Sequence, residues 1–210
     1  MNLIRRAALC LIAGTLACRG KADAPLSPRG FLGSELATPV AKPGATFTDS
    51  RGLPFQFDSA THDKVVLVVF GYTNCPDICP VHLANLAAVL DKMPDSVQNH
   101  VAVVFITTDP ARVSPLVLDQ WVHGFDPGFI GLTATDSVIA AAQRDAGEFA
   151  TVKGSPDAKG AYPVGHAAQV IAYTRDGMGR VAYPPGTRQR DWAHDLPLLV
   201  AFQPPAASRR

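Results

Sequence analysis

The sequence is poor in charge of either sign and poor in cysteine. Charged residues make up 18% of the 210-residue chain, the formal net charge is +1, and the positive charges form no cluster. This excludes the basic surface that is typical of nucleic-acid-binding proteins, so no nucleic-acid partner is expected. The chain also has no internal repeat and no glycine-rich phosphate loop. Because hydrophobic residues account for 47% of the chain, it can bury the core of one domain.

The N-terminus has no apolar run long enough to cross a membrane as a helix. The run Ala7–Ala17 follows two arginines and has the length of a signal-peptide core. Thr15-Leu16-Ala17-Cys18 resembles a bacterial lipobox, so we expect residues 1–17 to be a lipoprotein signal peptide and Cys18 to be lipidated. The protein is then lipid-anchored on the periplasmic side of the cell membrane. Cleavage after Ala24, which gives a soluble periplasmic protein, is the alternative, and a retained membrane anchor is a third.

Only four cysteines are present, and two of them belong to this leader. Cys10 leaves with the signal peptide and Cys18 carries lipid, which leaves Cys75 and Cys79 in the folded domain. The domain therefore has no spare cysteine for a structural disulfide elsewhere. A thiol pair of this kind has two chemistries open to it. It can exchange electrons as a dithiol and disulfide, or it can hold a soft metal such as Cu(I) as a dithiolate.

Hydrophobic patterning predicts an α/β domain over residues 45–202. The run Val65–Phe70 is apolar on both faces, which is typical of a central strand covered on both sides. Strands and helices then alternate, so a mainly parallel core is completed by an antiparallel hairpin and a helix. The expected elements are an N-terminal hairpin at 47–57, strands at 65–70, 101–106, 129–132, 168–173 and 179–183, and helices at 80–93, 114–123, 135–150 and 189–202.

Three further stretches are expected to lack regular structure. Residues 18–44 are rich in proline, alanine, glycine and serine and are predicted to form a flexible tether. Residues 151–164 are predicted to form a polar loop, and residues 203–210 a disordered tail.

The cysteine pair follows the first core strand and precedes its helix, with a proline after each cysteine. A dithiol at this junction indicates a thioredoxin-like fold, with a central mixed β-sheet flanked by helices. The nearby helix N-terminus favours a thiolate at Cys75. Positions i and i+4 of a helical turn share one side, so Cys75 and Cys79 can converge on one ligand. Oxidoreductases of this fold generally have two residues between their cysteines, and the third residue here suits a metal chelate.

His166 is the third candidate ligand, because it precedes a strand whose leading loop can lie beside the dithiol. Two thiolates and an imidazole give a three-coordinate site for Cu(I) or Cu(II). The alternative is a structural or exposed histidine. The other histidines show no ligand spacing and are interpreted as surface residues, although His82 is close enough to the thiols to contribute. Asp77 is interpreted either as an acceptor of loop N–H bonds or as a charge presented to a partner, and Asp109 as part of a turn.

The stretch Phe70-Gly71-Tyr72-Thr73-Asn74-Cys75-Pro76-Asp77-Ile78-Cys79-Pro80 resembles the signature of the SCO/SenC copper-chaperone family. Thr107–Pro110, the segment Trp121–Thr133 and Tyr162–His166 resemble further segments of that family in the same order, so the resemblance covers about residues 45–200. It implies a thioredoxin-like fold, one copper ion held by Cys75, Cys79 and His166, and a role in building the Cu(A) centre of cytochrome c oxidase.

The sequence departs from the family pattern at two positions beside the expected ligands. Gly165 stands where some members have an acidic residue, which puts in doubt a carboxylate that orients the histidine. Asn74 stands where many members have histidine, so one auxiliary ligand is absent.

The sequence is compatible with two functions of different classes. The first is a metallochaperone, a binding protein that takes copper from a periplasmic donor and delivers it to the Cu(A) subunit of the oxidase. Its thiols must be reduced to bind copper, which calls for a thioredoxin-like reductant in an oxidising compartment. The second is an enzyme, a thiol–disulfide oxidoreductase that reduces the cysteines of the oxidase subunit or of another copper protein, with Cys75 and Cys79 as its own redox disulfide. A thiol peroxidase fits less well, because it needs one activated cysteine and a distant resolving one.

Overall fold

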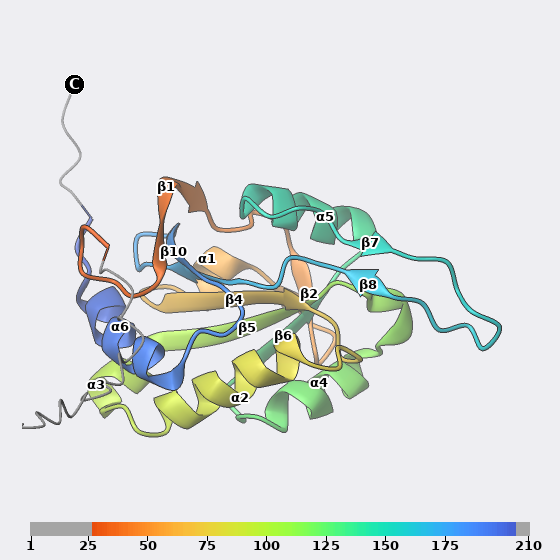
Figure 1. Ribbon diagram of the computed structural model, residues 1–210, viewed down its shortest axis with the longest axis horizontal. Helices are drawn as coiled ribbons and strands as arrows, with labels where there is room; N and C mark the ends of the chain where they lie inside the picture. Colours follow the sequence, from red (N-terminus) through yellow and green to blue (C-terminus); the bar gives the residue numbers. More distant parts are fainter. Residues whose placement is uncertain (1–26, 205–210) are drawn as a thin grey trace, which may run out of the picture.

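The apolar run that begins at Val65 forms the central strand of the structure. β4 (Val65–Gly71) is buried along its whole length and lies between β5 (Val101–Thr107), which runs parallel to it, and β9 (Val170–Tyr173), which runs antiparallel. The full sheet has eight strands in the order β1-β10-β9-β4-β5-β6-β2-β3 (Figure 1). The computed structural model describes residues 27–204, so the expected signal peptide and Cys18 lie outside the described residues. The predicted α/β fold with a central mixed sheet is confirmed.

The remaining elements surround this centre. The other strands are β1 (Ser34–Ala41), β2 (Phe47–Asp49), β3 (Pro54–Phe55), β6 (Ile130–Thr133), β7 (Val152–Lys153), β8 (Val164–Gly165) and β10 (Met178–Tyr183). The helices are α1 (Phe57–Ala60), α2 (Ile78–Leu90), α3 (Asp95–Gln98), α4 (Pro115–His123), α5 (Asp136–Asp145) and α6 (Gln189–Ala201), with a short 3-10 turn, η1 (Pro110–Arg112). The predicted hairpin at 47–57 is confirmed as β2 and β3, except that its last residue begins α1.

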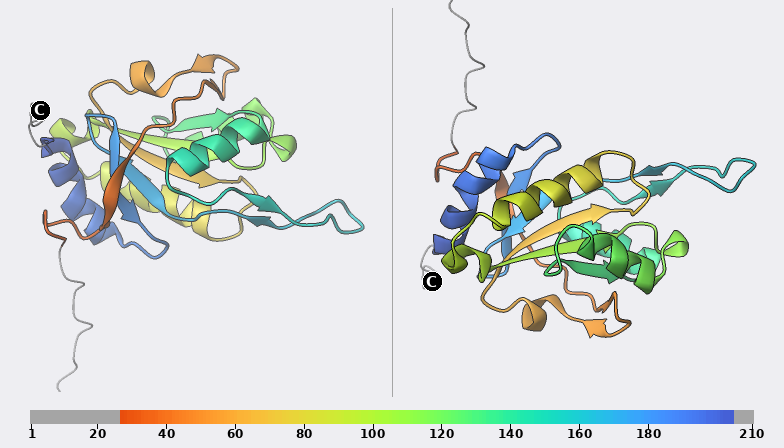
Figure 2. Two further views of the ribbon diagram at one scale, coloured as in Figure 1. Left: turned by 90° about the horizontal axis from the view of Figure 1, so that it is seen from above. Right: turned by 90° about the horizontal axis from the view of Figure 1, so that it is seen from below.

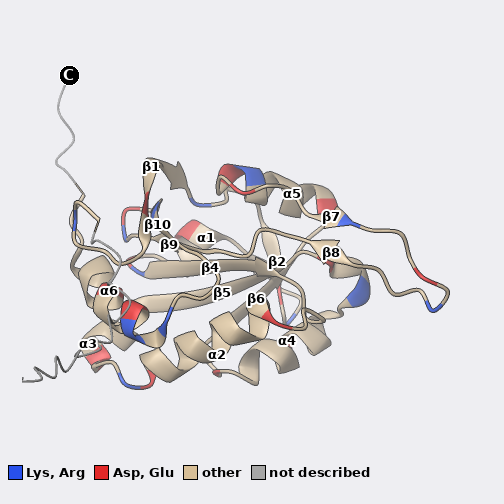
Figure 3. Cartoon of the chain, viewed as in Figure 1, with Lys and Arg blue, Asp and Glu red and all other residues tan. Residues whose placement is uncertain are grey.

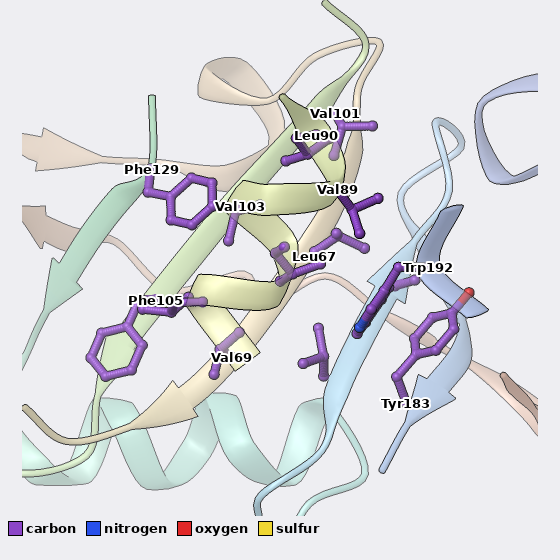
Figure 4. Packing of buried hydrophobic residues seen from close by; sticks show 14 of the residues in the cluster. Leu67, Val69, Val89, Leu90, Val101, Val103, Phe105, Phe129, Tyr183 and Trp192 are labelled. Carbon is purple, nitrogen blue, oxygen red and sulfur yellow. The ribbon is translucent and has the colours of Figure 1, made fainter. Parts of the chain in front are cut away.

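The two faces of β4 enter two different cores, because successive side chains of a strand point to opposite sides. Val65, Leu67 and Val69 belong to the cluster that α2, α4 and α6 cover. The alternate residues of β4 pack with α5 and with the phenylalanines of the β2–β3 hairpin and α1. Figures 1 and 2 show α2 and α4 on one side of the sheet and α5 on the other, and Figure 4 shows the first cluster. This two-sided covering explains why the strand has no polar face.

Local sequence decides where the helices next to the site begin. Ser114 caps α4 as predicted, with its hydroxyl accepting the backbone N–H of Val117 at 3.3 Å and Pro115 in the first turn. α2 begins at Ile78 rather than at Pro80, so Cys79 lies in the first helical turn. Pro80 is tolerated there because the first backbone N–H groups of a helix have no partner within the helix.

Two stretches that were expected to be irregular contain strands. Part of the expected tether forms β1, which pairs antiparallel with β10 at the edge of the sheet, so the tether prediction is wrong for residues 34–41. The expected loop at 151–164 contains β7 and the start of β8, which pair with each other. Residues 152–165, hereafter the arm, project from the body of the domain (Figures 1 and 2). The arm leads directly into His166.

Charged residues are scattered along the part of the chain that is described, and α2 carries none (Figure 3). Between residues 27 and 204 no helix is both long enough and apolar enough to cross a membrane.

Candidate metal centre

Three side chains that the sequence analysis selected come together at the C-terminal end of β4. The ligand atoms of Cys75, Cys79 and His166 all lie within 4.8 Å of one another, and Nε2 of His166 is 3.8 Å from Sγ of Cys79. Ligand atoms bonded at about 2.0–2.3 Å to one metal ion in a trigonal plane lie about 3.5–4 Å apart. The three groups therefore fit a single three-coordinate metal ion with small side-chain adjustments.

The two sulfurs converge in a different way from the one expected. The cysteines are not i and i+4 positions of one helical turn, because α2 begins at Ile78 and Cys75 precedes it. Cys75 is placed instead by a turn after β4, in which its backbone N–H donates to the carbonyl of Tyr72 at 3.0 Å. The site is therefore built from a loop and the first turn of a helix.

Two contacts orient the imidazole of His166. Its Nδ1 lies 2.7 Å from the carbonyl oxygen of Ala167, which can only accept a hydrogen bond, so Nδ1 carries the proton. The other ring nitrogen, Nε2, is the one that faces Cys79. The ring of Tyr72 packs edge-on against the imidazole, with ring centroids 5.5 Å apart at 83°. The hydrogen bond at Nδ1 and the packing of Tyr72 thus direct Nε2, the other ring nitrogen, toward the sulfurs.

The floor of the site requires glycine at position 71. A Cβ at Gly71 would lie 2.5 Å from Sγ of Cys79 and 2.8 Å from a ring carbon of Phe105. Both distances are too short for a non-bonded contact, so a side chain at position 71 would force the neighbouring atoms to move. The absence of a side chain here lets the Cys79 sulfur sit against the end of β4.

The two thiols differ in environment. Cys79 is buried, whereas Cys75 is partly exposed, and both are free. Burial raises the pKa of the Cys79 thiol well above its usual range, and the neighbouring Cys75 adds to that effect. The metal-free protein therefore keeps Cys79 protonated at neutral pH, and a metal that binds must displace that proton. Cys75, the partly exposed member of the pair, is the sulfur that a partner can reach.

His82 is not the surface residue that its sequence indicated. It is 3% exposed in α2, and its Nε2 donates to the carbonyl of Ala168 at 2.9 Å. That hydrogen bond occupies Nε2. His82 therefore holds the segment that carries His166 and is not one of the candidate metal ligands. Asp77, by contrast, is exposed and its side chain makes no capping hydrogen bond to α2.

Asp109 is more than a turn residue. It is 2% exposed at the end of β5, and it accepts a hydrogen bond from the hydroxyl of Tyr162 at 2.7 Å. Sequence reasoning missed this pairing, and also the roles of Gly71 and Tyr72, although all of these residues lie in the segments that carry the family resemblance. No periodicity or spacing distinguishes them, because their partners are distant in the chain.

Comparisons with known proteins identify the family of this chain. The model of the SCO1/SenC family matches residues 41–201. A curated relative, protein sco1 of Schizosaccharomyces pombe, is 33% identical over 124 residues, which are 59% of this chain and 46% of that protein. The match thus spans less than half the length of that relative.

Solved structures are similar over most of the described chain. Apo Sco1 from Thermus thermophilus has a TM-score of 0.70 at 31% identity, covering 80% of this chain and 96% of that one. ScoI from Bradyrhizobium japonicum, solved with copper bound, has a TM-score of 0.65 at 28% identity, covering 77% and 98%. These similarities confirm the thioredoxin-like fold. Because the family model covers most of the chain, this protein belongs to the SCO1/SenC family.

Proposed function

We propose that this protein is a periplasmic metallochaperone that binds one copper ion through Cys75, Cys79 and His166 and delivers it to the Cu(A) subunit of cytochrome c oxidase. The observation that carries the proposal is the convergence of two sulfurs and one imidazole nitrogen within 4.8 Å. Thiolates select Cu(I), and an imidazole suits Cu(II) as well. The copper-bound Bradyrhizobium japonicum relative supports the choice of metal, and the family resemblance supports the oxidase as client.

The unequal exposure of the two sulfurs supports a transfer by ligand exchange. A ligand from a donor or client can approach Cys75 from solvent, while the buried Cys79 holds the ion from the protein side. Each ligand is then replaced in turn, so the ion is never free. The thiols must be reduced first, which assigns a thioredoxin-like reductant as a further partner.

The leader completes the proposal. Residues 1–17 are proposed to be removed as a signal peptide, and Cys18 to hold the protein to the periplasmic side of the membrane by lipid. The copper site would lie at the C-terminal end of β4, beside the base of the arm. A soluble periplasmic form is the alternative.

A second candidate, thiol–disulfide exchange, is supported by the proximity of the two thiols. Sγ atoms of Cys75 and Cys79 within 4.8 Å of each other can form a disulfide after a small rotation. The partly exposed Cys75 would attack one sulfur of a substrate disulfide as a thiolate, which forms a mixed disulfide and displaces the other substrate sulfur. Cys79 would then attack the Cys75 sulfur, which closes the Cys75–Cys79 disulfide and releases the reduced substrate. Such a cycle does not need His166 as a ligand.

Copper titration of the reduced protein separates the two functions. We expect wild type to bind one Cu(I) per chain against a competing chelator, and the Cys75→Ala/Cys79→Ala variant to bind none. The oxidised protein, with its disulfide closed, should also bind none. If wild type fails to bind copper but turns over a disulfide substrate, the oxidoreductase function replaces the metallochaperone.

A further inference from the structure

A cluster beside the metal centre holds the base of the arm. Three residues form it: Asp109 at the end of β5, Arg112 in η1 and Tyr162 in the arm, hereafter the tyrosine clasp. The Tyr162 hydroxyl donates to Oδ1 of Asp109 at 2.7 Å, and Arg112 donates from Nε to Oδ2 of the same carboxylate. The two oxygens of one buried carboxylate are thus divided between the arm and η1.

Arg112 also contacts Tyr162 directly. Its guanidinium carbon lies 3.8 Å from the centre of the Tyr162 ring, and its Nη1 donates to the Tyr162 carbonyl at 3.3 Å. Ring, hydroxyl and backbone of one arm residue are therefore all engaged by two residues that follow β5. Because Asp109 is 2% exposed, these charge-assisted contacts are shielded from water and are stronger than surface ion pairs.

The other strand of the arm is fastened at the same place. Nζ of Lys153 in β7 lies 2.7 Å from Asp136 in α5 and 3.6 Å from Asp109. Lys153 pairs with Val164 across the two-stranded sheet, and Val152 pairs with Gly165. The clasp thus fixes both strands of the arm at their common base.

His166 is the next residue after this fixed base. Four positions separate it from Tyr162, and the intervening residues Val164 and Gly165 are paired in β8. The two sulfurs, in contrast, are carried by the loop after β4 and by α2, which the clasp does not include. The base of the arm therefore fixes the backbone that leads into His166, whereas other elements hold the thiols.

We propose that the tyrosine clasp positions His166 as a ligand and thereby governs how well the site holds Cu(II) relative to Cu(I). This inference rests on the proposed function. Cu(I) is satisfied by the two thiolates, whereas Cu(II) needs the imidazole as well. Tyr162 is a positioning residue, because it acts through His166 and does not touch the metal. Partners that hold metal ligands in orientation typically contribute about 10–100-fold to metal affinity.

The test is Tyr162→Phe, which removes one hydroxyl and keeps the ring under Arg112. We expect Cu(II) affinity to fall about tenfold or more and Cu(I) affinity to change by less than about threefold. A tenfold selective loss of Cu(II) raises the Cu(II)/Cu(I) reduction potential by about 59 mV. The sulfur-to-Cu(II) charge-transfer band and the EPR signal should also change, because the imidazole moves.

Tyr183→Phe is the matched control. Tyr183 in β10 donates its hydroxyl to a buried aspartate, Asp195 of α6, at 2.9 Å, so the same substitution removes the same kind of bond. Neither β10 nor α6 carries a ligand. This variant should lose stability yet keep the wild-type ratio of Cu(II) to Cu(I) affinity and the wild-type Cu(II) spectrum.

A second measurement needs no copper. Hydrogen exchange of the metal-free, reduced protein should be faster for the amides of residues 152–166 in Tyr162→Phe than in wild type, and unchanged there in Tyr183→Phe. Equal losses for both copper oxidation states, or no change in either, would overturn the clasp as a positioning device. If wild type binds no copper, the proposed function fails, and unchanged exchange in the arm would then separately overturn the positioning of His166.

Discussion

Nε2 of His166 lies 3.8 Å from Sγ of Cys79, although 87 positions separate the two residues in the chain. The pairing of β9 with β4 brings them together, because Val170 is the register partner of Val69 and both strands reach the same end of the sheet. The segment before β9 therefore arrives beside the loop after β4. The metal centre is a consequence of strand order, and each ligand can be tested by itself.

His166→Ala should separate the two oxidation states of copper. The variant keeps both sulfurs, so Cu(I) binding should stay within about tenfold of wild type, while Cu(II) binding and its visible spectrum should be lost. His62→Ala, at an exposed position, is the control and should behave as wild type. Unchanged Cu(II) affinity and an unchanged Cu(II) spectrum in His166→Ala would contradict the assignment of His166 as the third ligand.

Gly71→Ala should damage both the fold and the site. The new Cβ would meet the Cys79 sulfur at 2.5 Å, so either the sulfur or the end of β4 must move. Overpacking of this kind costs about 1–3 kcal/mol of unfolding free energy, and we expect weaker copper binding as well. Gly44→Ala is the matched control, because a Cβ there meets nothing within 4 Å. Urea unfolding and copper titration of the two variants check this, and equal behaviour would contradict the close approach.

The metal-free protein should lose stability as the pH falls below about 6.5, in part through His82. Burial lowers the pKa of His82 from its ordinary value of 6.5. Between that value and the lower folded-state pKa, the unfolded chain takes up a proton that the folded chain does not. The stability that His82 contributes is therefore fully present above pH 6.5 and is lost as the pH falls through this window, by up to about 1.4 kcal/mol per pH unit.

His82→Gln tests this assignment, because glutamine retains an N–H donor for the Ala168 carbonyl but does not titrate. Between pH 5 and 7, the unfolding free energy of the variant should depend less steeply on pH than that of wild type. The difference in slope should correspond to the uptake on unfolding of up to about one proton fewer. Losses caused by carboxylates begin at lower pH, near their ordinary pKa of about 4, and serve as the internal reference. Identical slopes for the two proteins would show that His82 does not titrate in this way.

Deleting β1 should destabilise the domain. A chain that begins at residue 43 leaves the edge of β10 unpaired. It also removes the backbone N–H groups of Leu32 and Gly33 from Asp195, whose side chain is fully buried. We expect a loss of about 3 kcal/mol or more relative to a chain that begins at residue 27. Removal of residues 203–210 is the control and should leave the unfolding free energy unchanged. Equal stability of the two N-terminal truncations would restore the tether prediction for β1.

Local sequence is enough to predict the elements that local physical chemistry controls. The apolar run Val65–Phe70 could only be a strand covered on both faces, and Ser114-Pro115 determined where α4 begins. The cysteine count and the position of the pair after the first core strand indicated a thiol site, and the family signature indicated His166 as its third ligand.

Tertiary structure decided everything that depends on distant partners. β1 has no alternating pattern that predicts a strand, and it exists because β10 offers an unpaired edge. His82 differs from an exposed histidine because the Ala168 carbonyl lies within hydrogen-bond distance of its Nε2. Asp109 takes part in the tyrosine clasp only because the arm brings Tyr162 to it. Spacing along a chain encodes helices and strands, whereas the meeting of His166 with Cys79 depends on the order of strands in the finished sheet.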